Sequence, residues 1–268
     1  MPEGHTLHRL ALDLNAAFGG RQLAVTSPQG RFAESAALID GATLVTASAH
    51  GKHLFLEFDR ALLLHIHLGL IGGLQIGPAA PPRGEVRVRL AAEDTVADLR
   101  GPQACVLRTP DEVARQVAAL GPDPLRPDAD PERAWTRIHR SNRPIAALLM
   151  DQTVLSGVGN VYRAEVLFRQ RLNPFREGSR LSRRSWDAIW ADLLALMPQG
   201  VTDNRIDTVR PEHLPELMGR PPRVDDHGGE VYVYRRHGQS CFVCGSKVRT
   251  EVLAGRNLFW CGKCQRRG

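Results

Sequence analysis

Two Cys-x2-Cys pairs near the end of the sequence constrain its fold more than any other feature. Cys241 and Cys244 form the first pair, Cys261 and Cys264 form the second, and sixteen residues separate the pairs. Each pair supplies two thiolates from one tight turn, and four thiolates form the tetrahedral sulfur shell that a structural zinc ion prefers. With the cysteines unmetallated, a segment this short would have too little core to fold. The spacing therefore predicts one structural Zn²⁺ per chain.

The residues between the two cysteine pairs predict a basic β-hairpin. Strands are expected over 248–253 and 258–260, joined by residues 254–257, with Arg256 at the tip. Residues 235–268 contain eight lysines or arginines and a single acid. This charge suits a phosphate backbone, although an arginine at a hairpin tip is more often only a solvated charge.

The first 120 residues predict a mainly β domain behind one helix. Apolar residues at helical spacing predict an amphipathic helix over 6–18. Short runs of alternating apolar and polar residues follow, separated by turn residues, as in antiparallel sheets. Seven such runs favour a β-sandwich: residues 44–48, 53–58, 62–68, 73–76, 86–90, 95–99 and 104–107. The fifth cysteine, Cys105, is expected to be a small buried side chain of this domain.

A proline-rich segment over 121–131 separates the β domain from a helical one. Its four prolines cannot continue a helix or a central strand, so we predict a linker. A helical domain over 132–234 and the zinc finger over 235–268 follow. Helices are expected at 132–140, 145–151, 159–170, 181–197 and 211–218. The predicted fold class is therefore α+β with two domains: an N-terminal β-sandwich with an N-terminal helix over 1–120, and a helical domain that carries the zinc-finger hairpin.

Charge is unevenly distributed along the chain. The formal net charge is +6, but residues 1–130 balance to −3 (12 basic against 15 acidic) and residues 131–268 to +9 (23 against 14). The second part is therefore the expected polyanion-binding part. The sequence has no apolar run of about 18 residues to span a membrane and no secretion signal, so we expect a cytoplasmic protein without membrane association. Nothing in the pattern suggests an interface helix, which favours a monomer.

The sequence begins Met1-Pro2-Glu3, which places a candidate nucleophile beside a candidate acid. Once Met1 is removed, Pro2 carries a secondary amine that can attack an aldehyde-like carbon and form an iminium, the electron sink of Schiff-base catalysis. Glu3 can protonate a leaving or ring oxygen as a general acid. Most Met-Pro starts have no such role, so the N-terminus alone is a weak indication.

The most specific stretch is residues 148–168, LLMDQTVLSGVGNVYRAEVLF. Gly157 and Gly159 let backbone amides approach a phosphate, and Asn160 adds a side-chain donor at the start of the next helix. Taken alone, the glycines are equally consistent with close packing of two helices. The stretch resembles the helix-two-turns-helix motif of the formamidopyrimidine-DNA glycosylase and endonuclease VIII family. The Pro-Glu-Gly start and the terminal zinc finger occur in the same order as in that family, and the resemblance covers nearly the whole chain.

The resemblance implies a role for each candidate site residue. Pro2 would be the Schiff-base nucleophile that attacks C1′ of a damaged nucleotide, and Glu3 the proton donor. Lys52, within His-Gly-Lys-His, is similar to the family lysine that contacts phosphate and assists β-elimination. The other implied DNA-contact residues are His67, Gly159 and Asn160 on the backbone, Arg256 on the backbone and in δ-elimination, Leu70 as the wedge that fills the gap left by a flipped nucleotide, and Arg100 as a further gap-filling residue.

The implied function is a bifunctional DNA glycosylase and abasic-site lyase of base excision repair, acting on damaged double-stranded DNA by β,δ-elimination. Such a bacterial protein associates with the nucleoid through DNA. The sequence departs from the family pattern at His5 and Thr6, where better-known members have proline and then an acidic residue. It departs again at Pro102, in place of an aromatic residue, and at Ile71, in place of the aromatic neighbour of the wedge in the endonuclease VIII branch.

Together with the Pro-Glu-Gly start, these departures favour the endonuclease VIII branch and oxidised pyrimidines as substrates. One alternative is a purine glycosylase of the 8-oxoguanine and formamidopyrimidine type. Another is a non-catalytic damaged-DNA-binding protein on the same scaffold. A general zinc-ribbon RNA-binding module is a third, but it leaves the N-terminus unexplained.

Overall fold

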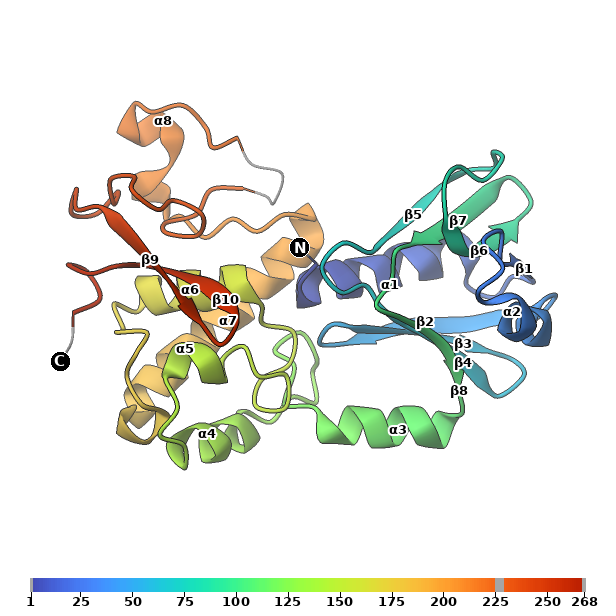
Figure 1. The fold of residues 1–268 in the computed structure, drawn as a ribbon, viewed down its shortest axis with the longest axis horizontal. Helices are drawn as coiled ribbons and strands as arrows, with labels where there is room; N and C mark the ends of the chain where they lie inside the picture. Colours follow the sequence, from blue (N-terminus) through green and yellow to red (C-terminus); the bar gives the residue numbers. More distant parts are fainter. Residues whose placement is uncertain (1, 225–228, 267–268) are drawn as a thin grey trace. The chain divides into compact units, whose positions relative to one another are not determined.

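The chain divides into two compact units, Met1–Ala119 (unit 1) and Leu120–Gly268 (unit 2) (Figure 1). The structure is a computed structural model that describes residues 2–224 and 229–266. Each unit has its own hydrophobic core, and each is described by itself below. The proposed domain boundaries at residues 120, 131 and 234 stay predictions.

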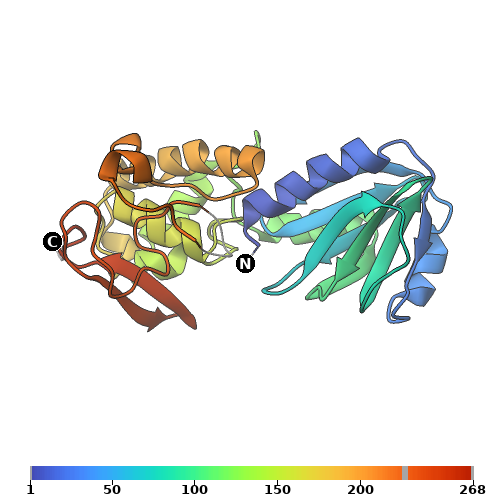
Figure 2. The ribbon, with the colours of Figure 1, turned by 90° about the horizontal axis from the view of Figure 1, so that it is seen from above.

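Unit 1 is a β-sandwich of two four-stranded antiparallel sheets (Figures 1 and 2). One sheet has the strand order β2-β3-β4-β8 and the other the order β1-β6-β7-β5. All seven predicted strands are present, and the structure adds a three-residue strand, β1. The strands are β1 (Ala24–Thr26), β2 (Leu44–His50), β3 (His53–Phe58), β4 (Leu62–His67), β5 (Gly73–Pro78), β6 (Val86–Ala92), β7 (Thr95–Arg100) and β8 (Ala104–Arg108).

The N-terminal helix α1 (Gly4–Phe18) runs antiparallel to β2. Gly20 N donates to Leu44 O over 2.8 Å, and Asn15 exchanges two 2.7 Å hydrogen bonds with the backbone of Ala47. The twelve residues from Asn15 back to residue 3 span about 18 Å of helix, and the five from Ala47 forward to residue 52 span about 17 Å of strand. The start of α1 and the β2–β3 turn therefore lie at the same end of unit 1 (Figures 1 and 2).

Two helices of unit 1 were not predicted from the sequence pattern. Helix α2 (Ala33–Ile39) is short, and every residue of α3 (Pro110–Ala119) is at least partly exposed, so neither presents a clear apolar stripe. Helix α3 nevertheless has a sequence signature. Thr109 Oγ1 accepts from Glu112 N and Thr109 N donates to the Glu112 carboxylate, which is a capping box followed by proline at the first helical position.

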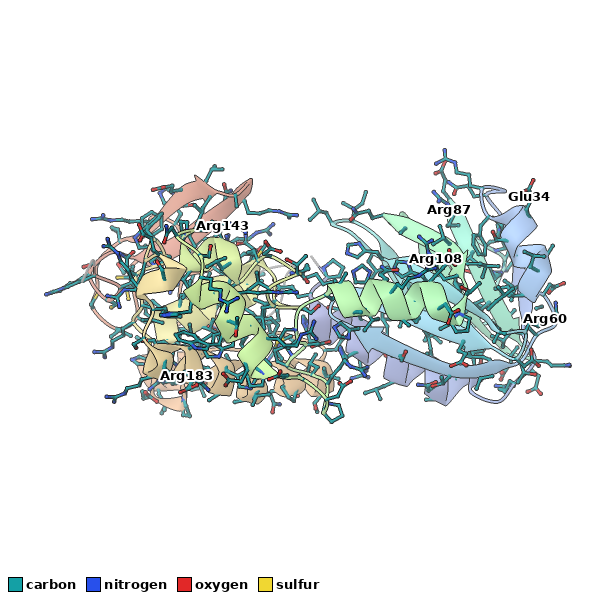
Figure 3. All side chains as sticks on the ribbon, turned by 90° about the horizontal axis from the view of Figure 1, so that it is seen from below. Glu34, Arg60, Arg87, Arg108, Arg143 and Arg183 are labelled. Carbon is teal, nitrogen blue, oxygen red and sulfur yellow. The ribbon has the colours of Figure 1, made fainter. Side chains whose placement is uncertain are left out.

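Unit 2 is helical and ends in a β-hairpin. Its helices are α4 (Pro131–His139), α5 (Ile145–Leu148), α6 (Asn160–Arg169), α7 (Arg183–Asp203) and α8 (Pro215–Met218), with 3-10 turns at Gly178–Arg180 and Pro211–His213; its strands are β9 (Val248–Leu253) and β10 (Arg256–Cys261). Apolar residues of α4 to α7 and of the zinc-finger segment share one core. The Arg183 side chain at the start of α7 forms an ion pair with Glu132 of α4 (Figure 3). The predicted fold class is confirmed.

Unit 2 differs from the expectation in several details: the helix expected over 211–218 is a 3-10 turn followed by α8, and Arg256, expected in the hairpin loop, is the first residue of β10. Helix α7 continues through Pro198 to Asp203, beyond the predicted end at residue 197, and stops at Asn204 in the left-handed conformation. The proline-rich segment is held against the chain rather than free, because Gly121 N donates to Gln152 O (2.8 Å) and Ser156 N to Pro122 O (3.0 Å). Within the described residues, no helix is long and apolar enough to cross a membrane.

Candidate functional site

The start of α1 holds the predicted nucleophile and acid. Pro2 is partly exposed, whereas Glu3 is the N-cap residue of α1 and its side chain is fully buried. The Glu3 carbonyl oxygen accepts from Thr6 N over 2.9 Å, which fixes the first turn of the helix. Pro2, whose nitrogen would become the N-terminal amine on removal of Met1, is thereby placed next to a carboxyl group that is shielded from bulk water. Met1 lies outside the described residues.

Lys52 and His67 lie at this same end of unit 1. Lys52 occupies a two-residue turn with Gly51, whose φ of +57° favours glycine. The turn brings His50 of β2 opposite His53 of β3, and His53 in turn pairs with His67 of β4. Lys52, in the β2–β3 turn, and His67, at the end of β4, therefore lie close together at the end of the sheet where α1 begins.

A histidine network under α3 was not singled out in the sequence. His53 Nδ1 and His65 Nε2 are 2.9 Å apart, and the Gln116 amide nitrogen from α3 lies 3.2 Å and 3.3 Å from these two atoms. The His53 ring is also 4.9 Å from the ring of His67. Figure 3 shows α3 across this face of the sheet, with Arg108 beside it. The period-two spacing His65-x-His67 is the signal that places both rings on one face.

Burial holds these histidines neutral at physiological pH. Burial and then the neighbouring His65 and His67 lower the pKa of His53 to about 3, and Lys52 acts in the same direction. Burial and then Arg108 lower the pKa of His65 to about 4. Burial also lowers the pKa of His5 in α1 to about 4. Unfolding returns each ring to its ordinary pKa near 6.5.

Unit 1 is therefore expected to lose stability as the pH falls below about 6.5. Between about pH 6.5 and pH 4, these histidines are protonated in the unfolded chain but stay neutral in the folded chain. The free energy of unfolding therefore falls as the pH falls. These shifts correspond to a loss on the order of 2 kcal/mol for each of His53 and His65 by pH 5, or roughly 4 kcal/mol for the pair. Chemical denaturation of the zinc-loaded protein at pH 7.5, 6.5 and 5.0 measures it.

Two variants separate the effect of histidine protonation on stability from the release of zinc at acid pH. A double variant, His53→Phe with His65→Leu, should show a shallower fall of the unfolding free energy from pH 6.5 to 5.0. His237→Gln, at an exposed histidine of unit 2, should keep the wild-type fall. Equal slopes for the double variant and the wild type would contradict the proposed cause.

The β4–β5 loop presents two aliphatic side chains to solvent. Leu70, the predicted wedge, is 56% exposed, and Ile71 beside it is 90% exposed. Arg100, the further predicted gap-filling residue, is engaged differently. Its guanidinium donates to Asp98 Oδ2 (2.8 Å), to Arg83 O (3.1 Å) and, more weakly, to Gln75 Oε1 (3.4 Å). Arg100 is thus tied to its own sheet in this structure, and its DNA contact stays a prediction.

The turns before α6 are organised by Gln152, which sequence reasoning also missed. Its side-chain nitrogen donates to Met150 O and Val158 O, both over 3.0 Å, and its oxygen accepts from Gly157 N over 3.0 Å. The Gly157 amide, expected to face a phosphate, is therefore used inside the loop. Gly159 is the N-cap residue of α6, so the helix N-terminus remains at the predicted place.

The structure brings Asn160 next to the tip of the hairpin. Asn160 Nδ2 donates to Asn257 O over 3.0 Å, and its side-chain oxygen accepts from the fully buried Arg163. Arg256 is the first residue of β10, after a two-residue turn in which Ala254 and Gly255 both have positive φ. Asn160 is itself buried, and its bond to Asn257 places it beside the residue that follows Arg256, although Asn160 and Arg256 are 96 positions apart in the sequence.

A buried glutamate anchors α6 to the segment that precedes the zinc finger. Glu165 accepts four hydrogen bonds: from Thr208 Oγ1 (2.6 Å), Tyr232 N (2.7 Å), Val233 N (2.8 Å) and Tyr234 N (2.9 Å). A buried carboxylate is tolerated only with such partners. Because three of the donors are backbone amides, this interaction fixes the path of the chain into the finger.

The four cysteines converge as predicted. Their sulfur atoms all lie within 4.8 Å of one another, with Cys241 Sγ 3.9 Å from Cys264 Sγ and Cys244 Sγ 3.4 Å from Cys261 Sγ. A tetrahedral zinc ion with Zn–S bonds near 2.3 Å separates its sulfur ligands by about 3.8 Å. The arrangement fits a structural zinc ion bound by four thiolates.

Three family models match the chain in succession. The formamidopyrimidine-DNA glycosylase N-terminal domain matches residues 1–105, the formamidopyrimidine-DNA glycosylase H2TH domain matches residues 120–210, and the zinc finger found in FPG and IleRS matches residues 238–267. Lactococcus lactis Fpg in complex with DNA containing an abasic site has the same fold, with a TM-score of 0.81 at 20% identity, covering 99% of this chain and 100% of that one.

Curated relatives extend over the whole chain. Endonuclease 8 1 of Mycobacterium tuberculosis is 50% identical over 274 residues, which cover 99% of this chain and 100% of the relative. Probable endonuclease 8 2 of Streptomyces coelicolor is 32% identical over 99% of this chain and 94% of its own length. Formamidopyrimidine-DNA glycosylase of Methylococcus capsulatus is 34% identical over 85% of this chain and 84% of its own length. The chain thus belongs to the formamidopyrimidine-DNA glycosylase and endonuclease VIII family and is an endonuclease VIII-type DNA glycosylase and abasic-site lyase.

Proposed function

We propose that this enzyme binds duplex DNA, excises oxidised bases with a preference for pyrimidines, and cleaves the strand by β,δ-elimination from a Schiff base on Pro2. The observation that carries the proposal is the partly exposed Pro2 beside the buried Glu3, at the same end of unit 1 as Lys52 and His67. The 50% identity to an endonuclease 8 supports the pyrimidine preference over the purine alternative.

In the first half of the reaction, the Pro2 nitrogen attacks C1′ of the damaged nucleotide. The glycosidic bond breaks, and the base leaves with the bonding electrons and a proton. Glu3 protonates the sugar ring oxygen, the C1′–O4′ bond opens, and the nitrogen lone pair forms the iminium. Because Glu3 is shielded from bulk water, its proton is delivered to bound substrate.

In the second half, the iminium acidifies the C2′ proton. Its removal breaks the C3′–O bond and releases one phosphate, which is the β-elimination. A further proton loss breaks the C5′–O bond and releases the second phosphate, which is the δ-elimination. Lys52 and Arg256 stabilise the charge on these leaving phosphates, and water then hydrolyses the remaining iminium to restore the Pro2 amine.

Unit 2 holds the DNA backbone in this proposal. The N-terminus of α6 at Gly159 offers backbone amides to an anion, and Asn160 is bonded to Asn257, the residue next to Arg256. Arg163 and Glu165 position these groups rather than touching DNA, because both are fully buried. Zinc holds the hairpin that carries Arg256 and takes no part in the chemistry.

The enzyme reaches a damaged nucleotide by flipping it out of the DNA duplex. A base inside the stack is inaccessible, and extruding it costs a few kcal/mol, less where damage weakens pairing. Leu70 is the wedge that fills the gap, since an exposed aliphatic side chain can stack between bases without losing hydrogen bonds. The lower flipping cost of a damaged nucleotide therefore supplies part of the selectivity.

Borohydride trapping on end-labelled duplexes tests the proposal. The duplexes carry 5-hydroxyuracil, thymine glycol, 8-oxoguanine or an abasic site, and intact mass first verifies that Met1 has been removed. We expect covalent complexes that form faster on the two pyrimidine lesions than on 8-oxoguanine. A faster reaction on 8-oxoguanine would favour the purine alternative, and binding without any trapped complex would favour a non-catalytic damaged-DNA-binding protein.

A further inference from the structure

The wedge loop is packed against a second loop that supplies an amide side chain. Residues 68–72 connect β4 to β5, residues 101–103 connect β7 to β8, and Gly73 at the start of β5 pairs with Arg100 at the end of β7. Gln103 N donates to His67 O over 2.8 Å, which joins the two loops through the backbone.

Gly69 cannot carry a side chain here, because Gln103 fills that space. Gly69 has a φ of +69°, and a Cβ atom added to it would lie 2.9 Å from Gln103 Cβ and 3.2 Å from Gln103 Oε1. The first distance is shorter than real Cβ contacts, the second is tight, and the positive φ itself disfavours a side chain. The position directly before the wedge Leu70 is therefore occupied by a side chain from another loop.

The Gln103 side chain is held at one end and exposed. Gly69 N donates to His67 Nδ1 over 3.2 Å, so the neutral His67 ring carries its proton on Nε2. The Gln103 side chain hydrogen-bonds this histidine and thereby partly opposes the effect of burial on its pKa. Gln103 is nevertheless exposed, and its amide group has both NH₂ donors and a carbonyl acceptor with which to meet a base.

Gln103 is the polar side chain of these two loops, and Arg100, at the end of β7 directly before the second loop, is held by Asp98. Asp98 is buried, accepts two hydrogen bonds from Arg89 (2.6 and 2.8 Å) and accepts one from Arg100 (2.8 Å). Moving the Arg100 guanidinium into a DNA gap would break an ion pair at a buried carboxylate, which is costly. Gln103 can turn without such a cost.

We infer that Gln103, and not Arg100, is the residue that contacts the base opposite the lesion. This inference rests on the proposed function. Once Leu70 and Ile71 fill the gap, the orphaned base loses its partner, and its pairing edge faces the loops that carry the wedge. An amide can both donate and accept hydrogen bonds, so Gln103 adapts to more than one opposite base while still ranking them.

Binding of an uncleavable abasic analogue tests the inference without requiring catalysis. Duplexes carrying tetrahydrofuran opposite A, G, C or T are titrated with the wild type, Gln103→Ala, Gln103→Glu and Gln22→Ala. Gln22 is an exposed amide beside Leu23, at the opposite end of unit 1 from the wedge loop, and is the matched control.

In the wild type, the duplex affinities for the best and the worst opposite base should differ by about threefold to tenfold, which corresponds to one neutral hydrogen bond. Gln103→Ala should bring the four affinities to within about twofold of one another. Gln103→Glu should reorder them, and Gln22→Ala should keep the wild-type order. A purely structural role, through His67, would weaken all four duplexes by one common factor.

Unchanged ratios among the four duplexes in Gln103→Ala, or a uniform loss without a change in ratios, would overturn the inference. Failure of the proposed function gives a different result, namely normal binding with no borohydride-trapped complex on lesion duplexes.

Discussion

Replacing Pro2 by glycine is expected to reduce borohydride trapping on an abasic duplex by roughly 10²- to 10³-fold, because the nucleophile loses its orientation. Glycine replaces the secondary amine of proline by a primary amine at the same position and removes the ring that prevents rotation about the N–Cα bond of residue 2. Pro2 directly precedes Glu3, the N-cap residue of α1, so its ring limits where the nitrogen can point. Single-turnover trapping rates measure the loss.

Binding separates this chemical effect from misfolding. Pro2→Gly should bind a tetrahydrofuran duplex within about threefold of the wild type, since none of the proposed phosphate contacts is changed. Pro81→Gly, at an exposed proline of the same unit, should keep the wild-type trapping rate. Loss of binding together with loss of trapping would indicate misfolding and leave the nucleophile unidentified.

A blocked N-terminus provides the stricter control. A removable extension before Pro2 converts its amine into an amide nitrogen, which cannot form an iminium. Trapping should be absent with the extension and return after its proteolytic removal, in the same protein preparation. Trapping that persists on the extended protein would assign the Schiff base to another amine, for which Lys52 is the candidate at this end of unit 1.

The sequence predicted those parts of the fold that have a local signature. Alternating residues located every strand from β2 to β8, and the cysteine spacing located the finger, because in both cases the pattern follows from one element's own geometry. Helix α3 was not predicted because none of its residues is buried in the core, although the capping box of Thr109 and Glu112 can be recognised in the sequence. Helix α7 passes Pro198 because its buried face, with Met197 and Gly200, continues on both sides of the proline.

The site was less predictable, because its supporting contacts join residues far apart in the sequence. Glu165 reads as an ordinary polar position of a helix, yet its partners are Thr208 and three consecutive backbone amides. Arg163 likewise binds Asn160 within its own helix and Asn257 of the hairpin. A resemblance can assign a role to Asn160, but only the fold shows what holds it in place.

Removing the structural zinc is expected to have the second large effect, centred on unit 2. Cys241 and Cys261 are buried in the core that also contains Val248, Leu258 and Phe259, so the metal site and the hairpin share one set of apolar contacts. Apparent binding energies of structural zinc ions are about 10–16 kcal/mol, which exceeds the stability of most single domains. Cys261→Ser should therefore lose zinc and unfold the finger.

The loss should extend to DNA affinity through two specific connections. Asn257 O, between the finger and α6, accepts from Asn160, and Gln265 bridges Cys261 N (2.9 Å) to Leu172 O (3.0 Å). When the finger unfolds, Arg256 is no longer held beside Asn160. The hairpin then loses both its order and the phosphate contact proposed for Arg256. Duplex binding should therefore weaken by at least about tenfold.

Zinc content and duplex affinity, measured on the same preparations, test this coupling. Cys105→Ala is the matched control, because Cys105 lies in unit 1 and burial raises the pKa of its thiol to about 12, which disfavours the thiolate a metal needs. It should keep one zinc per chain and wild-type affinity. One zinc per chain in Cys261→Ser would contradict the four-thiolate site, and zinc loss with unchanged affinity would mean that the hairpin does not carry the phosphate contact.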